Sequence, residues 1–227
     1  MSIGPSMPLR LEKPEGIDLA QAARYFGARG GADAATQALL EKCAVPLLAA
    51  AMPRAVWLLA DTPALTEAGI LPGEDVHKHL AGCGQAILLA VTLGPGVDAQ
   101  IRRAGVGDIA AGVASDALGS ALAEQAADAA EAQLRQWAAT EGKYLTGRFS
   151  PGYGDWDIAV QPLVAAAGHR AQGRAVRHRH QPDDPAQERD CPVGGQRPPG
   201  KRTTGRVRPL RAAHPLRIQK EGKDLCK

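Results

Sequence analysis

Aromatic residues are scarce in this chain. Phe, Tyr and Trp make up 4% of the 227 residues, although apolar residues as a whole make up 44%. Most of the apolar surface therefore belongs to Ala, Leu and Val, a composition that favours helices packed closely through small side chains. A chain of this length can bury one core, with or without an additional tail.

The sequence also lacks long apolar runs and short cysteine spacings. It has no run of about 18 apolar residues, the length of a transmembrane helix. Met1–Gly16 has neither the basic start nor the apolar middle of a signal peptide. The four cysteines are too widely spaced for a zinc pattern or a small disulfide framework; they are Cys43, Cys83, Cys191 and Cys226. We expect a cytoplasmic protein with free thiols and no membrane partner.

The net charge of +3 hides two halves of opposite sign. Residues 1–166 have 12 Lys and Arg against 18 Asp and Glu, whereas residues 167–227 have 15 against 6. The second segment also contains seven prolines and no Phe, Tyr or Trp. Because such a composition buries little apolar surface, we predict a folded unit over 1–166 and a disordered basic tail over 167–227.

The first part of the folded unit predicts short helices alternating with strands. Asp33 and Gly27 have the properties of a helix N-cap and a helix stop, respectively. Two apolar runs have the length of a strand. One contains Trp57, which we expect in the core, and the other directly precedes Gly94. The predicted helices are 17–26, 33–49 and 74–80, and the predicted strands are 55–59 and 86–93.

Two features of this part could bind a ligand, but a structural explanation is simpler for each. Gly94-Pro95-Gly96 follows a strand and precedes a helix, as phosphate-binding turns do, yet it lacks the complete glycine spacing and the Lys-Ser/Thr pair. His77 and His79 are two residues apart, so on a helix they point to different faces. We expect a plain strand-to-helix turn and two solvated histidines.

A long helix is predicted over 108–139, after a break at 105–107. Its apolar residues recur every four or five positions and should face the core; they are Ile109, Val113, Leu118, Leu122, Ala126, Ala130 and Leu134. Small residues at helical spacing would let a neighbouring element pack closely; they are Gly112, Ser115, Gly119 and Ala123.

The most informative stretch follows this helix, at residues 148–156, with the sequence R-F-S-P-G-Y-G-D-W. Pro151, Gly152 and Gly154 allow the backbone to turn tightly and to approach a ligand closely. Arg148 can form a fork of hydrogen bonds to a carboxylate, and Tyr153 and Trp156 offer flat faces to a ring or cation. An ordinary surface turn with its aromatics packed on the core would use similar residues.

The order of these residues resembles a known signature. Arg-x-x-Pro-Gly-Tyr after an Ala/Glu-rich helix resembles the S-adenosylmethionine-binding signature of the reactivation domain of cobalamin-dependent methionine synthase, in its stand-alone form. The resemblance extends over most of residues 17–165. It implies an α+β fold in which helices pack on a small twisted, mostly antiparallel sheet.

The resemblance also implies a function. The family's domain presents S-adenosylmethionine to an oxidised cobalamin while a flavodoxin-like electron donor reduces it. By residue-for-residue match, Arg148 would pair with the methionine carboxylate, Pro151 and Gly152 would approach the ligand through their backbone, and Tyr153 would pack on it. Glu124 matches a family glutamate near the ligand's amine, although a solvated helix carboxylate is the more ordinary explanation, because acidic residues are mostly exposed.

Cobalamin would have to come from a partner, because the chain has no D-x-H-x-x-G cobalamin motif. The expected partners are therefore a corrinoid-binding methionine synthase component and a flavodoxin-like donor. On this interpretation the chain is at most an accessory component of a methyltransferase.

The resemblance stops near residues 165–168. The family's later P-x-x-x-x-x-K-S-V-x-A-x-x-G segment and late cysteine cluster are absent. Residues 178–193, 195–199 and 207–210 are compatible, codon by codon, with the displaced readings I-D-I-N-P-M-I-L-L-K-S-V-T-A-L-W, V-S-D-R-P and C-G-H-C. We therefore hypothesise that a frameshift replaced about the last sixty residues, which the nucleotide sequence read in three frames would test.

Two alternatives remain open at this stage. The Arg-rich tail could bind an acidic partner, but it has no aromatic residue for base stacking, so nucleic acid is not the expected partner. The chain could also be a mainly helical interaction module that has lost the chemistry. A titration with S-adenosylmethionine distinguishes these possibilities.

Overall fold

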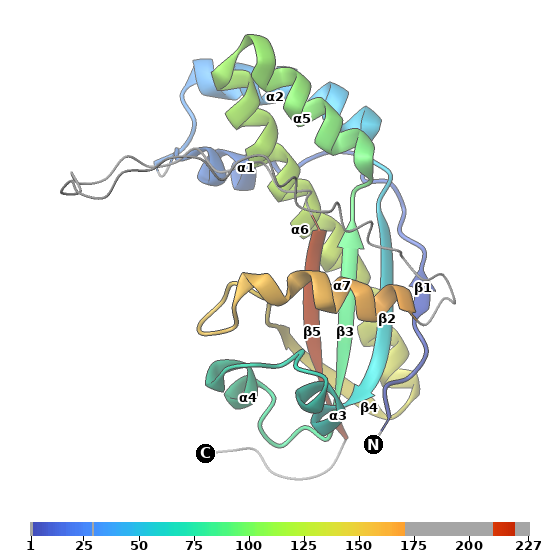
Figure 1. Ribbon diagram of the computed structural model, residues 1–227. Helices are drawn as coiled ribbons and strands as arrows, with labels where there is room; N and C mark the ends of the chain where they lie inside the picture. The colour runs from blue at the N-terminus through green and yellow to red at the C-terminus, as the bar shows by residue number, and fades with distance from the viewer. Residues whose placement is uncertain (1, 29, 171–210, 221–227) are drawn as a thin grey trace, which may run out of the picture.

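The computed structural model describes residues 2–28, 30–170 and 211–220 of the chain, which form a mixed α and β structure (Figure 1). The elements before the long helix are β1 (Met7–Leu9), α1 (Leu19–Phe26), α2 (Ala34–Ala50), β2 (Arg54–Asp61), α3 (Thr62–Glu67), α4 (Glu74–His79), β3 (Gln85–Thr92) and α5 (Pro95–Gly107). The long helix α6 (Ile109–Thr140) is followed by β4 (Lys143–Arg148), a 3-10 turn (Ile158–Val160), α7 (Gln161–Arg170) and β5 (Arg211–Lys220). The predicted α+β fold with helices on an antiparallel sheet is confirmed.

The sheet has five strands in the order β1-β2-β3-β5-β4, and all neighbouring strands are antiparallel. Its longest ladders join β2 to β3, from Arg54 opposite Thr92 to Asp61 opposite Gln85, and β3 to β5. The two predicted strands correspond to β2 and β3, at the centre of this sheet. Most of their residues are apolar (Ala, Leu, Val, Ile or Trp), which suits strands covered by helices on both faces.

Helices cover both faces of the sheet, and the alternation of side chains along each strand explains the two cores. Trp57 belongs to the core that contains α1, α2, α5 and α6, whereas its neighbour Leu58 belongs to the core that contains α3, α4 and α7. In β3, Leu89 and Leu88 divide between the same two cores. Figure 1 shows α7 crossing one face of the sheet while α6 lies behind the other. Trp57 is buried, as predicted.

Local signals fix the helix ends close to their predicted positions. The carboxylates of Asp18, Asp33 and Asp108 accept hydrogen bonds from backbone N–H groups in the first turns of α1, α2 and α6, respectively. Gly27 ends α1 in the left-handed conformation, with φ at 104°. The predicted helices over 17–26 and 33–49 therefore differ from α1 and α2 only at their ends.

The start of α6 corrects one prediction. Ile109 and Val113 were expected to face the core, yet their exposed fractions are 82% and 49%. The reason is the tight crossing of α5 and α6, in which a Cβ atom on Gly112 would lie 2.7 Å from the Cα of Gly105. The helices meet through these glycines, so the larger side chains point outward. The predicted core positions from Leu118 onward are buried.

The turn at Gly94-Pro95-Gly96 has a packing explanation, as expected. A Cβ atom on Gly96 would lie 2.8 Å from the carbonyl oxygen of Ala50, and one on Gly94 would lie 3.4 Å from the Cβ of Met52. The backbone N–H of Met52 also donates to the Leu93 oxygen over 2.8 Å. The glycines therefore let the end of α2 pack closely against this turn.

The C-terminal segment differs from its expected form at one place. Arg211–Lys220 forms β5, which separates β3 from β4 in the sheet, although the sequence predicted no strand after residue 166. The predicted boundary at 167 falls inside α7. The remainder of the predicted tail, residues 171–210 and 221–227, lies outside the described residues, as do two of the four cysteines.

The two cysteines in the described part, Cys43 and Cys83, are both buried. Within that part, no helix has the combination of length and apolar character that a bilayer crossing needs.

Candidate functional site

The signature at residues 148–156 runs around the outer edge of the sheet. It begins at Arg148, the last residue of β4, whose side chain is bonded to α6 on one face. It ends at Trp156, which is fully buried in the core of the opposite face with α3 and α4. One short segment therefore contacts both helical layers, which places its turn at the rim of the fold.

Arg148 lies among three carboxylates of α6. Its Nη1 donates to Glu131 Oε2 over 2.9 Å, and its Nη2 donates to Asp128 Oδ1 over 2.6 Å and to Glu124 Oε2 over 3.2 Å. The side chains of Arg148 and Glu131 are each 15% exposed, whereas Asp128 is 69% exposed. One edge of the guanidinium is thus held in a half-buried ion pair and the other faces solvent-accessible acids.

The helical spacing of α6 assembles this group. Glu124, Asp128, Glu131 and Arg135 follow one another at steps of four, three and four residues, so they line one face of the helix. Arg135 pairs with Glu131 and also donates to the main-chain oxygens of Leu145 and Thr146. Glu131 therefore joins two arginines, and Arg135 fixes β4 against α6.

The turn itself is held by main-chain hydrogen bonds. Gly152 N–H donates to the Trp156 oxygen over 2.6 Å, and Tyr153 N–H donates to the Ser150 oxygen over 3.0 Å. Gly152 has φ at 102°, and a Cβ atom there would lie 3.3 Å from Ile158 Cδ1. The conformation of the turn and its packing on Ile158 are therefore enough to explain the glycine at this position, whether or not a ligand binds there. Pro151 is buried beside it.

Aromatic side chains stack beneath the turn. The Phe149 ring lies parallel to Trp156 at 6.0 Å and to His79 at 5.1 Å between centroids, and meets Tyr153 edge-on at 6.1 Å. His79 was expected to be solvated, but it is half-buried, and its Nε2 donates to the Gly147 oxygen over 3.1 Å. Tyr153 keeps an exposed fraction of 59%. Of these rings, Tyr153 is the most exposed.

Asp155 connects the turn to α4. Its carboxylate accepts hydrogen bonds from the backbone N–H groups of Glu74, over 2.6 Å, and Asp75, over 3.0 Å. These two bonds, the one from Asp75 first, hold the pKa of Asp155 below its ordinary value. Trp156 Nε1 donates to the Ile70 oxygen over 3.1 Å, in the loop that precedes α4.

The structure brings together two of the predicted site residues, Arg148 and Glu124, from positions 24 residues apart. Pro151, Gly152 and Tyr153 lie on the turn that follows Arg148, as the sequence order requires. Sequence reasoning missed the other residues that hold this region, Asp128, Glu131 and Asp155. A signal existed for Asp128 and Glu131, since they share a helical face with Glu124, but none existed for Asp155.

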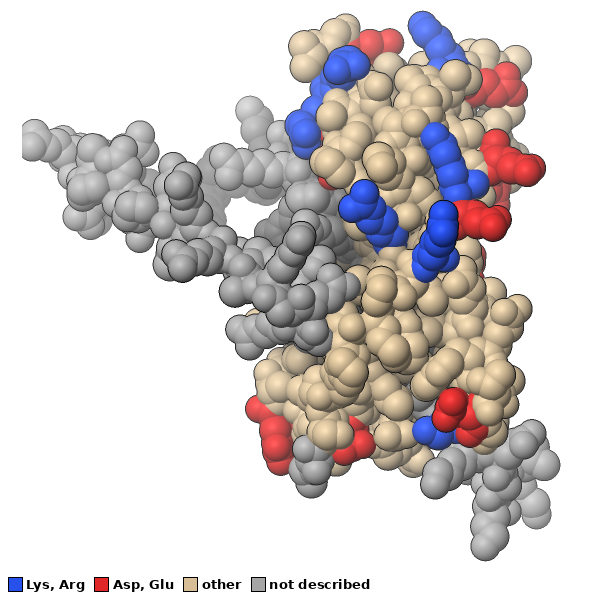
Figure 2. Space-filling model, turned by 90° about the vertical axis from the view of Figure 1, so that its right-hand side faces the viewer, with Lys and Arg blue, Asp and Glu red and all other residues tan. Residues whose placement is uncertain are grey.

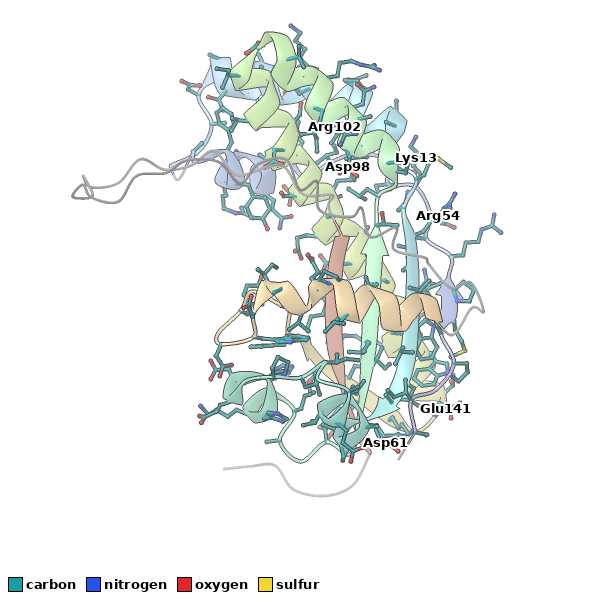
Figure 3. The ribbon with its side chains drawn as sticks, viewed as in Figure 1. Lys13, Arg54, Asp61, Asp98, Arg102 and Glu141 are labelled. Carbon is teal, nitrogen blue, oxygen red and sulfur yellow. The ribbon has the colours of Figure 1, made fainter. Side chains whose placement is uncertain are left out.

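Basic side chains gather on a different surface. The face in Figure 2 carries several Lys and Arg side chains, and Figure 3 shows Lys13, Arg54 and Arg102 at the end of the sheet where α5 begins. Lys13 Nζ donates to the Ala49 oxygen over 2.9 Å, at the C-terminal end of α2. Asp98 and Arg102 lie one helical turn apart on α5 (Figure 3).

No group of His, Cys, Asp and Glu side chains suited to a metal ion occurs in the described part of the chain. Comparison with protein-family models and with curated proteins gave no match for this sequence.

Proposed function

We propose that the chain binds S-adenosylmethionine at the rim formed by α6 and the 148–156 turn, and that it presents this ligand to the cobalamin of a partner methionine synthase. The observation that supports this proposal best is the pairing of Arg148 with Glu124, 3.2 Å apart, beside a turn with the order R-x-x-P-G-Y. These two residues offer a cation and an anion to a ligand that carries both charges.

The charges of the site fit this ligand. Arg148 and its three carboxylates have a formal charge of −2, or −1 with Arg135 included. S-adenosylmethionine carries a sulfonium, an ammonium and a carboxylate, so its net charge is positive. The net positive charge of such a ligand would offset the excess of carboxylates in the site, and its own carboxylate could pair with the guanidinium of Arg148.

Binding would proceed by exchange of partners on Arg148. Asp128 is the most exposed of the three acids and occupies Nη2, so the ligand carboxylate would replace it there. Glu131 would keep its bond to Nη1 and hold the guanidinium in place. Glu124, released from Nη2, would accept a hydrogen bond from the ligand's ammonium group. Tyr153 would cover the ligand with its exposed ring.

The bound ligand would supply an electrophilic methyl group, which a partner's cobalamin accepts after a flavodoxin-like donor has reduced the cobalt. The contribution of this chain is positioning, since the reactive atoms belong to the ligand and the partner. The half-buried pair of Arg148 and Glu131 and the turn fixed at Gly152 would hold the ligand in a defined position.

Isothermal titration with S-adenosylmethionine tests the proposal. The unaltered chain should bind, Arg148→Ala and Glu124→Gln should weaken binding, and Lys42→Ala, an exposed cation on α2, should not. Lys78 is a poorer control because it pairs with Glu74 and Asp75 next to the turn. S-adenosylhomocysteine, which lacks the sulfonium charge, should bind more weakly. Absence of binding to the unaltered chain would refute the proposal and favour an interaction module.

A further inference from the structure

The turn at residues 148–156 meets α4 through two aspartates that bond reciprocally. Asp155 accepts hydrogen bonds from the N–H groups of Glu74 and Asp75, and Asp75 Oδ2 accepts one from the N–H of Asp155 over 3.3 Å. The residues are 80 positions apart in sequence. Each carboxylate therefore caps the backbone of the other's segment, an arrangement that we call the aspartate clamp.

The two glycines beside the clamp, Gly73 and Gly154, have no space for a side chain, because the carboxylate of the opposite segment occupies it. A Cβ atom on Gly73 would lie 2.5 Å from Asp155 Oδ1, and one on Gly154 would overlap the Asp75 carboxylate. Both glycines also have positive φ, at 99° and 54°. Side chains are thus excluded on both sides by the opposite carboxylate, which indicates that the close approach of these two segments is specific.

The other end of α4 holds the beginning of the same turn. His79, the last residue of α4, donates to the Gly147 oxygen over 3.1 Å and stacks on Phe149 with 26° between the ring planes. The clamp lies at the first residues of this six-residue helix. One short helix therefore contacts the segment just before Arg148 and the segment just after Tyr153.

We infer that Asp155 and Asp75 are positioning residues, and that α4 acts as a brace which sets the place of the 148–156 turn relative to α6. The inference that this placement matters for a ligand depends on the proposed function. The role of α4 as a brace does not depend on that function, because it concerns only how firmly the turn is held. Loss of the clamp should free the turn while the sheet and α6 remain folded.

Amide hydrogen exchange measured by NMR on the full chain tests the brace directly. Asp155→Ala should accelerate exchange at Gly152 and Trp156 by at least about tenfold, the change expected when a charge-assisted hydrogen bond is lost. Amides in β3, such as Leu88, should keep their rates. A merely global loss of stability would instead accelerate β3 equally.

The matched control is Asp157→Ala. Asp157 is also an exposed acid that caps a turn, but its 2.9 Å hydrogen bond, from Ala159 N–H, stays within its own segment. Its removal should leave the exchange of Gly152 unchanged. Asp155→Asn should restore part of the protection, because its side-chain oxygen still accepts a hydrogen bond. The double variant of Asp75 and Asp155 should cost less than the sum of the single changes.

Exchange at Gly152 and Trp156 that is equal in Asp155→Ala and in the unaltered chain would overturn the inference. A parallel titration with S-adenosylmethionine separates it from the proposed function. About tenfold weaker binding by Asp155→Ala, with Asp157→Ala unchanged, supports both. Accelerated exchange without binding by the unaltered chain keeps the brace and refutes the proposed ligand.

Discussion

Replacement of Arg148 by alanine separates the stability of the site from its binding. The half-buried pair with Glu131 is a charge-assisted contact, whereas the pairs with Glu124 and Asp128 are more exposed and contribute about 0–1 kcal/mol each. Since Glu131 keeps Arg135, we expect Arg148→Ala to lower the free energy of unfolding by about 2 kcal/mol. Urea unfolding followed by circular dichroism measures this change.

The same variant should lose affinity for S-adenosylmethionine by about tenfold to a hundredfold, the equivalent of about 1.5–3 kcal/mol. Arg148→Lys should recover part of it, because an ammonium keeps the charge without the planar fork. Adding Glu131→Gln to Arg148→Ala also removes the charged partner of Arg135, so it should lower stability further and restore no affinity. Unchanged affinity in a folded Arg148→Ala protein would refute the role given to this residue.

Three further predictions concern the frame around the site. The pKa of Asp155 is lowered in the fold, so its contribution to stability is complete above the ordinary value of about 3.9 and is lost as the pH falls through the folded pKa. The free energy of unfolding should therefore fall more steeply below about pH 4 in the unaltered chain than in Asp155→Asn. Parallel curves for the two proteins would contradict this. Trp156→Phe should destabilise by about 2–3 kcal/mol in urea unfolding, because it removes buried volume and leaves the Ile70 oxygen without its donor; a loss below about 0.5 kcal/mol would show that the contact is unimportant. A stop at position 211 should leave β3 and β4 without their shared partner and promote association, visible in light scattering; a monomer of unchanged stability would show that β5 is dispensable.

The helices and central strands could be predicted because their signals are local. Asp33 and Gly27 mark helix ends through side-chain and backbone preferences of single residues. The apolar run of β3 stands out because both of its faces are buried, so no polar alternation interrupts it. Such features need no knowledge of the rest of the chain.

The two missed strands on the far side of the sheet depend on distant partners. β5 contains Pro215, which has no N–H to donate, and lies opposite Leu88, more than a hundred residues earlier in the chain. β4 contains Gly147 and shows a register shift against β5 between Leu145 and Arg148. Neither sequence is typical of a strand, so pairing rather than propensity decides their structure.

The site was predictable in part for a related reason. Arg148 stood out by its place in a signature, but its partners could be found only by combining that signature with the helical face of Glu124. Asp155 offered no such route. It acts on Glu74 and Asp75 through backbone groups, which any residue possesses, so the sequence contains no complementary side chain to reveal the contact.

The acidic face of α6 gives the proposed site a second line of support. Like charges three or four residues apart destabilise a helix by about 0.2–0.5 kcal/mol per pair, and Glu124, Asp128 and Glu131 form two such pairs. Well-packed apolar residues would often serve stability as well as a half-buried ion pair does. The opposite face of α6 uses that solution, with Leu122 and Ala126 buried in the core. One helix thus follows the rule for stability on one side and departs from it beside Arg148, as expected if the proposed ligand uses those charges.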